Sequence, residues 1–155
     1  MIDDVRRIPL RRIEDDRGWF CELRRDSALP KPMRQTNASF SRAGVVRGLH
    51  YHERGQDDLF ACLWGTARVV VLDRETGAAF VEDIGEKNPV AIYVPGHHAH
   101  GFEALTDILF CYHVTVEFDP DDPDEHTVPW NDPRVAHLWS SSTPILSSRD
   151  AAVES

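Results

Sequence analysis

The sequence predicts an all-β protein, folded as a double-sheet jelly roll or barrel with few, short helices. Short apolar or alternating runs recur along the chain, and turn residues containing glycine or proline separate them. Ten prolines interrupt most windows in which a helix would form. Since 155 residues is an ordinary length for one domain and enough to bury a core, we expect a single domain over residues 1–155.

The strand predictions follow the chain in order. Residues 34–41 alternate polar and small side chains, as a strand facing a wet cavity does, and residues 59–64 form a short apolar run. Residues 67–72 and 78–84 flank a glycine-containing turn, which is typical of a hairpin. Residues 90–94 stop at a Pro-Gly breaker. In a last strand at 108–118, side chains 112, 114, 116 and 118 point to one side.

The two ends of the chain carry weaker signals. Apolar and basic residues alternate over residues 5–13, which suits an edge strand that needs a partner. Short helical turns are expected near residues 26–29 and 132–138. Residues 140–155 are polar and small, so composition alone predicts a frayed terminus.

Composition excludes several classes of function. The net charge of −9 argues against general affinity for nucleic acid or anionic membranes, because neutralising phosphates needs a positive face. Apolar runs are far shorter than the ~18 residues of a membrane-spanning helix. The acidic N-terminus lacks the apolar segment of a secretory signal, and the three widely spaced cysteines are typical of reduced thiols. We therefore expect a cytoplasmic protein.

Five of the eight histidines fall into two groups, His50 and His52, then His97, His98 and His100. Residues i and i+2 of a strand face the same side, so His50 and His52 are expected to project together. Two such histidines, a carboxylate and a distant histidine would suit a divalent metal. Clustering without function is the equally weighted alternative. Close to the first group, Arg47 would place an anion-binding side chain beside a candidate base, His50.

Several motifs make the interpretation more specific. RGLHYH at residues 47–52 and AHGF at 99–102 resemble motifs of the dTDP-4-dehydrorhamnose 3,5-epimerase family, which has the cupin fold. Further matches lie in order along the chain: DDRGWFCE (15–22), RQTNASFSRAGVVRGLH (34–50), YHVTVEFDP (112–120), EHTVPWNDP (125–133) and LSSRDA (146–151). The resemblance implies a cupin-type double-stranded β-helix. It also implies an epimerase that inverts C3, C5 or both of a nucleoside-diphosphate 4-keto-6-deoxy sugar, most simply a dTDP sugar.

The same resemblance assigns roles to residues. His50 would be the base, Asp150 the carboxylate that pairs with it, and Tyr112 the proton donor. The implied substrate-binding residues are Arg17, Phe20, Glu22, Gln35, Asn37, Arg47, His100, Glu125 and Arg149. Residues 140–155 would then fold over the barrel mouth instead of fraying. Residues 1–25 would contribute strands to a homodimer, with Arg17 serving the neighbouring subunit's site. No cofactor is implied.

The chain departs from the family at residues that matter. Alignment places Asp58 where the family has a lysine that stabilises the enolate, and a carboxylate would repel that charge. His52 follows the tyrosine of RGLHYH, and Phe118 replaces a frequent tyrosine. One alternative is therefore a divalent-metal cupin using His50, His52, Asp58 and His100, with isomerase, cyclase or oxygenase chemistry. In two others, Asp58 merely pairs with a neighbouring arginine such as Arg54, or the chain binds sugar nucleotides without catalysis.

Overall fold

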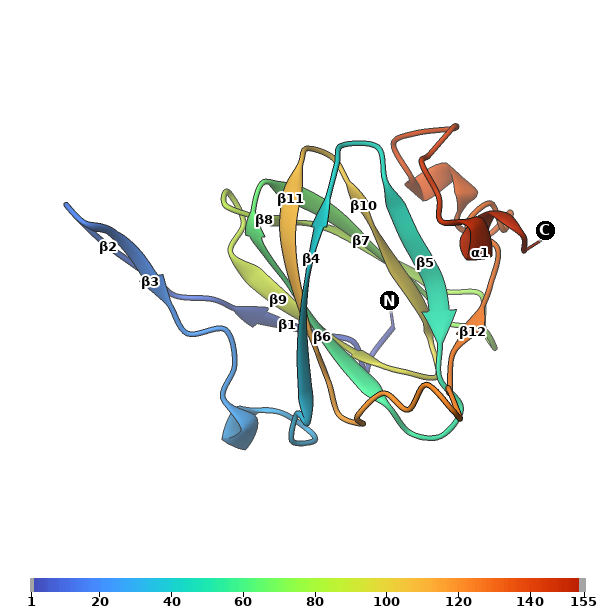
Figure 1. The fold of residues 1–155 in the computed structure, drawn as a ribbon, viewed down its shortest axis with the longest axis horizontal. Helices are drawn as coiled ribbons and strands as arrows, with labels where there is room; N and C mark the ends of the chain where they lie inside the picture. Colours follow the sequence, from blue (N-terminus) through green and yellow to red (C-terminus); the bar gives the residue numbers. More distant parts are fainter. Residues whose placement is uncertain (1, 154–155) are drawn as a thin grey trace.

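Two five-stranded antiparallel sheets pack face to face in the computed structural model, which describes residues 2–153 (Figure 1). The first sheet has the order β1 (Arg6–Pro9), β9 (Val90–Pro95), β6 (Asp57–Trp64), β11 (Ile108–Val114) and β4 (Gln35–Ser41). The second has the order β12 (His126–Thr127), β5 (Val46–Tyr51), β10 (Ala99–Ala104), β7 (Thr66–Leu72) and β8 (Ala79–Gly85). The predicted jelly-roll architecture is confirmed.

The core lies between the sheets because each strand alternates inward and outward side chains. Phe60 of β6 and Phe110 of β11 come from the first sheet, and Phe102 of β10 comes from the second. The rings of Phe102 and Phe110 stack with centroids 3.8 Å apart, and Phe60 meets both edge-on. On each of these strands, the residue two positions away faces the same side as the phenylalanine. These residues are Asp58 on β6, His100 on β10 and Tyr112 on β11. The sandwich is therefore apolar at one end and polar at the other.

A β-bulge shapes the second sheet at the polar end. On β5 and β10, His50 pairs with His100 whereas Arg47 pairs with Phe102, so the register shifts between these pairs. Gly48 absorbs the irregularity with φ of 130°. A side chain there would place its Cβ 2.7 Å from Gly101 Cα. Residues three apart on a regular strand face opposite sides, but the bulge lets both Arg47 and His50 line the cavity.

Most of the strand predictions are confirmed, including the β7–β8 hairpin, but two expectations about the bounds of strands were wrong. The strand predicted over 108–118 ends at Val114. The predicted single edge strand over 5–13 is divided into β1, which pairs with β9, and β2 (Arg12–Asp15), which pairs with β3 (Gly18–Cys21). The β2–β3 hairpin extends away from the sandwich (Figure 1).

The C-terminal segment is ordered, contrary to the expectation from its composition. Single 3-10 turns occur at η1 (Asp26–Ala28) and η2 (Ala136–Leu138), and the short helix α1 (Ser148–Ala151) lies beside β5 (Figure 1). Val46 also donates to the carbonyl of Ile145, which ties the segment to the second sheet. Residues 154–155 of the tail lie outside the described residues.

Two other expectations concern the chain as a whole. Within the described residues, none of the helices has the length and apolar character needed to cross a membrane. Cys62 and Cys111 are buried, Cys21 is half-buried, and all three are free thiols as expected.

Candidate active site

A cavity of about 1150 Å³ opens at the polar end of the sandwich, between the two sheets and the C-terminal segment. β4, β6 and β11 supply one wall, β5 and β10 the other, and α1 covers one side. Eleven of the candidate site residues from the sequence line this cavity: Gln35, Asn37, Arg47, His50, His52, Asp58, His100, Tyr112, Glu125, Arg149 and Asp150.

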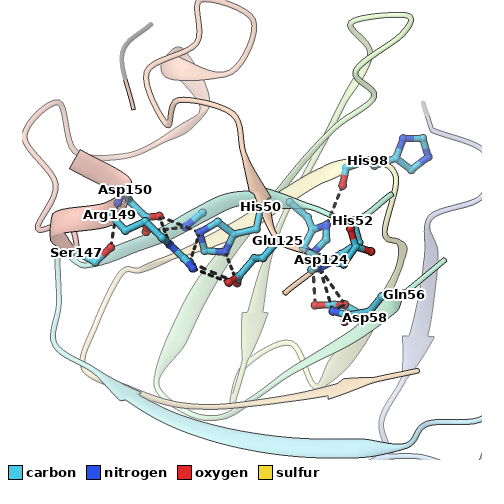
Figure 2. A network of polar contacts seen from close by, with 12 residues as sticks. His50, His52, Gln56, Asp58, His98, Asp124, Glu125, Ser147, Arg149 and Asp150 are labelled. Carbon is cyan, nitrogen blue, oxygen red and sulfur yellow. Dashed lines mark hydrogen bonds and ion pairs between the residues drawn. The ribbon is translucent and has the colours of Figure 1, made fainter. Parts of the chain in front are cut away.

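His50 and Asp150 form a hydrogen-bonded pair at the rim of this cavity. His50 Nε2 lies 2.9 Å from Asp150 Oδ1, and Asp150 is only 3% exposed (Figure 2). Ser147 caps α1 by accepting a hydrogen bond from the Asp150 backbone N–H, which fixes the carboxylate in place. Burial alone would raise the pKa of Asp150, but His50, the Gly48 N–H and Arg149 together lower it. Asp150 is therefore an anion that can orient the ring and support its charged form.

Arg149 and Glu125 surround the outer edge of the same histidine. Arg149 forms an ion pair with Glu125, and its Nη2 lies 3.0 Å from His50 Nε2 (Figure 2). Glu125 Oε1 lies 3.9 Å from His50 Nδ1, on the other side of the ring. A histidine between a buried carboxylate and an ion pair has both nitrogens in a polar setting, as a proton-transfer group requires.

Tyr112 faces the cavity from the opposite sheet. It lies on β11, paired with Asn37 of β4 and Phe60 of β6. Burial raises the pKa of Tyr112, and the Asp58 charge adds to this effect, whereas Arg47 opposes it. The phenol therefore stays protonated across the neutral range and can donate a proton into the cavity.

His52, Asp58 and His100 meet at the inner end of the cavity, and all three are buried. Burial would lower the pKa of His100 and raise that of Asp58, but their mutual attraction moves both in the opposite direction. Burial and the charge of His100 lower the pKa of His52. The alternative four-ligand set is not assembled in full, because His50 Nε2 is turned to Asp150 and only His52, Asp58 and His100 form a cluster.

The alternative in which Asp58 pairs with Arg54 was also wrong. Arg54 forms its ion pair with Asp122, with 2.6 Å between Nη1 and Oδ2, on the exposed side of the loop. Asp58 points inward instead and accepts a hydrogen bond from Gln56 at 3.0 Å.

A polar wall continues the cavity away from His50. Gln35 donates to Asn37, and its amide oxygen accepts from the Phe118 N–H, so both amides are fixed on one face of β4. Arg47 donates to the Ser41 hydroxyl at 3.0 Å and to the Phe40 carbonyl. These hydrogen-bond donors and acceptors suit the nucleobase and the diphosphate of a nucleotide.

Comparison with known proteins identifies the family to which the chain belongs. The family model of dTDP-4-dehydrorhamnose 3,5-epimerase matches residues 1–155. The chain belongs to this epimerase family. The Escherichia coli dTDP-4-dehydrorhamnose 3,5-epimerase is 35% identical over 164 residues, covering 96% of this chain and 88% of that protein. The Bacillus subtilis spore coat polysaccharide biosynthesis protein SpsL is 38% identical over 149 residues, covering 91% of this chain and 98% of that protein.

A solved structure supports the same assignment. The rmlC epimerase of Mycobacterium tuberculosis superimposes with a TM-score of 0.87 at 31% identity, covering 99% of this chain and 84% of that one. The predictions of a cupin-type all-β fold and of an isomerase of the epimerase class are therefore confirmed.

Within the described residues 2–153, three of the predicted substrate-binding residues lie outside the cavity of this epimerase. Arg17 lies at the turn of the β2–β3 hairpin and forms an ion pair with Asp15. Phe20, on β3, is 67% exposed, and Glu22 just beyond it forms an ion pair with Arg25. These side chains lie on or just beyond the hairpin that extends from the sandwich.

Sequence reasoning missed several residues that position the epimerase site. Ser147 is one of them, and its capping-box spacing from the predicted Asp150 is a local signal for the start of α1. Gln56 and Asp124 gave no such signal. Asp124 accepts from the N–H groups of Glu53 and Arg54, about seventy residues away, and such a contact depends on the fold.

Proposed function

We propose that this epimerase inverts C3, C5 or both of a dTDP-linked 4-keto-6-deoxy sugar. The ketone at C4 acidifies the protons on C3 and C5, so a base can remove one if the resulting enolate is stabilised. Returning a proton to the opposite face inverts the carbon. The reaction thus needs a base and an acid on opposite sides of the sugar ring.

One observation carries the proposal: His50 and Tyr112 face one cavity from opposing sheets. We assign His50 as the base. We place its proton on Nε2, facing the Asp150 carboxylate, and this assignment makes Nδ1 the basic atom. Tyr112, protonated at neutral pH, is the acid. Glu125 and Arg149 hold the outer side of the His50 ring, and His100 lies near the sugar.

The nucleotide end would bind along the other wall. Arg47 is placed to contact the diphosphate, since a guanidinium binds phosphate oxygens in a bidentate manner. Gln35 and Asn37 are placed to contact the nucleobase. We further infer a homodimer in which the partner's hairpin supplies Arg17, Phe20 and Glu22, because these residues lie outside the cavity of their own chain. Exposed Ile13 and Trp19 on the same hairpin support that inference.

We also infer a cytoplasmic location. None of the three cysteines forms a disulfide, as is usual in a reducing compartment.

Solvent-proton exchange tests the proposed reaction directly. The wild-type protein is incubated with dTDP-4-keto-6-deoxyglucose in heavy water, and NMR follows deuterium uptake at C3 and C5. Uptake is expected, and the labelled carbon defines which centre is inverted. His50→Ala should abolish it, whereas His137→Ala, which changes an exposed histidine outside the cavity, should not. Undiminished uptake in His50→Ala would refute His50 as the base.

A further inference from the structure

Three potential metal ligands converge at the inner end of the cavity. His52 follows β5, Asp58 lies on β6 and His100 on β10, so both sheets contribute. They are 6%, 5% and 3% exposed, and one ligand atom from each lies within 4.8 Å of the others. Figure 2 shows His52 and Asp58 apart from the His50–Asp150 pair.

The atoms of this cluster lie farther apart than good hydrogen bonds require, at or slightly beyond the spacing of two ligands on one ion. His52 Nε2 lies 3.8 Å from Asp58 Oδ1, and His100 Nε2 lies 3.4 Å from Asp58 Oδ2. Good hydrogen bonds would be about 2.7–3.2 Å long. Two donors bound to one ion at about 2.0–2.2 Å lie roughly 2.8–3.6 Å apart. Small side-chain adjustments would therefore bring all three atoms to one ion.

Both histidines turn Nε2 toward Asp58. His52 Nδ1 donates to the Asp124 carbonyl, and His100 Nδ1 donates to the His98 carbonyl at 2.8 Å. A carbonyl only accepts, so each Nδ1 carries a proton, and Nε2 is the nitrogen that faces Asp58 and binds an ion once it gives up its own proton. Backbone carbonyls behind ligating histidines are a recurrent feature of metal sites.

The geometry points to a binding site for one divalent transition-metal ion, held by Nε2 of His52, Nε2 of His100 and a carboxylate oxygen of Asp58. Two histidines and one carboxylate suit Fe²⁺, Mn²⁺, Co²⁺, Ni²⁺ or Zn²⁺. The cavity supplies the remaining coordination positions, because all three residues line it. Gln56 Nε2 lies 3.0 Å from both His52 Nε2 and Asp58 Oδ1, and a half-turn of this amide would present its oxygen to the ion.

A charge argument links this site to the reaction, and this step alone rests on the proposed function. Asp58 stands where the motif alignment places a lysine. A dication bound by one carboxylate and two neutral imidazoles has a net charge of +1, the same as that lysine. An ion held by these three residues would restore a positive centre beside the sugar and would supply Lewis-acid polarisation of the ketone oxygen.

The chain offers a matched control cluster of the same residue types. Asp4, His97 and His98 also lie within reach of one another, but Asp4 and His97 are exposed. His98 Nε2 is already 2.8 Å from Asp4 Oδ1, so that nitrogen is engaged in a hydrogen bond. We expect this second cluster to bind more weakly.

Cobalt titration of the full chain, stripped with EDTA and dialysed, tests the site without any substrate. Calorimetry and the visible absorption of Co²⁺ should show one ion bound tightly per chain. Asp58→Asn and His52→Gln should each weaken binding at least about tenfold, whereas His97→Gln should leave it unchanged. Absence of binding, equal binding by Asp58→Asn, or loss of binding only in His97→Gln would overturn the site.

A second measurement needs no substitution, in case the variants fail to fold. Substoichiometric Mn²⁺ added to protein with ¹⁵N-labelled histidine should broaden the ring signals of His52 and His100 first. Broadening confined to His97 and His98 would overturn the site.

Deuterium uptake with and without Co²⁺ then separates the site from the reaction. Uptake that depends on the ion supports its role in catalysis, and uptake equal in the stripped protein removes that role. Tight Co²⁺ binding with no uptake under either condition supports the site while counting against the proposed substrate.

Discussion

His50 and Asp150 are separated by 100 residues, yet Nε2 of the one lies 2.9 Å from Oδ1 of the other. The contact joins β5 to α1, so the carboxylate that orients the ring also attaches the C-terminal segment to the sandwich. Helix α1 has only four residues and would not persist alone. Contacts with the sandwich therefore hold it in place, and they include this pair, the Arg149–Glu125 ion pair and the backbone bond between Val46 and Ile145.

Asp150→Asn should slow deuterium uptake by about 10²-fold or more, because the ring loses its oriented tautomer and the charge that supports its protonated form. The substitution should also destabilise the protein. Since the folded pKa of Asp150 lies below its unfolded value, the stabilisation is fully present above about pH 4 and is lost as the pH falls through the folded pKa. Urea unfolding of wild type and variant should thus differ constantly from pH 7 to 5 and converge below pH 4. A constant difference below pH 4 would contradict this.

Tyr112→Phe should separate proton removal from proton return. His50 still removes the substrate proton and can return solvent deuterium to the same face, so uptake should continue while inversion falls by about 10²–10⁴-fold. Because burial raises the pKa of Tyr112 above the ordinary value of 10.0, any alkaline loss of wild-type kcat from this group should set in at a higher pH than an ordinary phenol would give. NMR that follows label and stereochemistry in one sample checks both points. Equal losses of uptake and inversion would argue against Tyr112 as the acid.

The sequence predicts the strands well because their signal is local. Alternation along β4 and the β-branched run in β7 each reflect which face of that strand is buried. The site is less predictable, since its geometry depends on how distant strands are aligned. No local pattern reports that Arg47 and His50 share a face, because that arrangement requires the register shift between β5 and β10. The composition of the tail likewise carries no information about Asp150, whose position depends on a contact made after folding.

Gly48→Ala tests whether that register shift positions the site. The methyl group would meet the Gly101 backbone, and the φ of 130° is unfavourable for any L side chain. We expect a loss of about 2–4 kcal/mol in the free energy of unfolding, together with reduced epimerase activity. Gly55→Ala is the matched control, because Gly55 also has positive φ but no atom within 4 Å of the added Cβ. It should cost only about 1 kcal/mol and leave activity unchanged. Similar costs for both variants in urea unfolding would contradict the role of the close β5–β10 approach.

Mixing two inactive variants tests whether the β2–β3 hairpin of one chain completes the cavity of its partner. Arg17→Ala removes the hairpin cation, and His50→Ala removes the proposed base, so each homodimer should be inactive or nearly so. In a mixed dimer, the hairpin of the His50→Ala chain would complete the cavity of the Arg17→Ala chain, giving one intact site of two. Refolding the variants together at equal amounts should recover roughly a quarter of wild-type activity.

The double variant Arg17→Ala/His50→Ala mixed with wild type is the control for this experiment. Every mixed dimer then has one chain lacking both groups, so neither cavity holds both an intact hairpin and an intact base. Such mixing should reduce activity below that expected from separate wild-type dimers. If the two single variants stay inactive together although light scattering shows exchanged dimers, Arg17 serves its own chain or none, and the partner's hairpin does not complete the site.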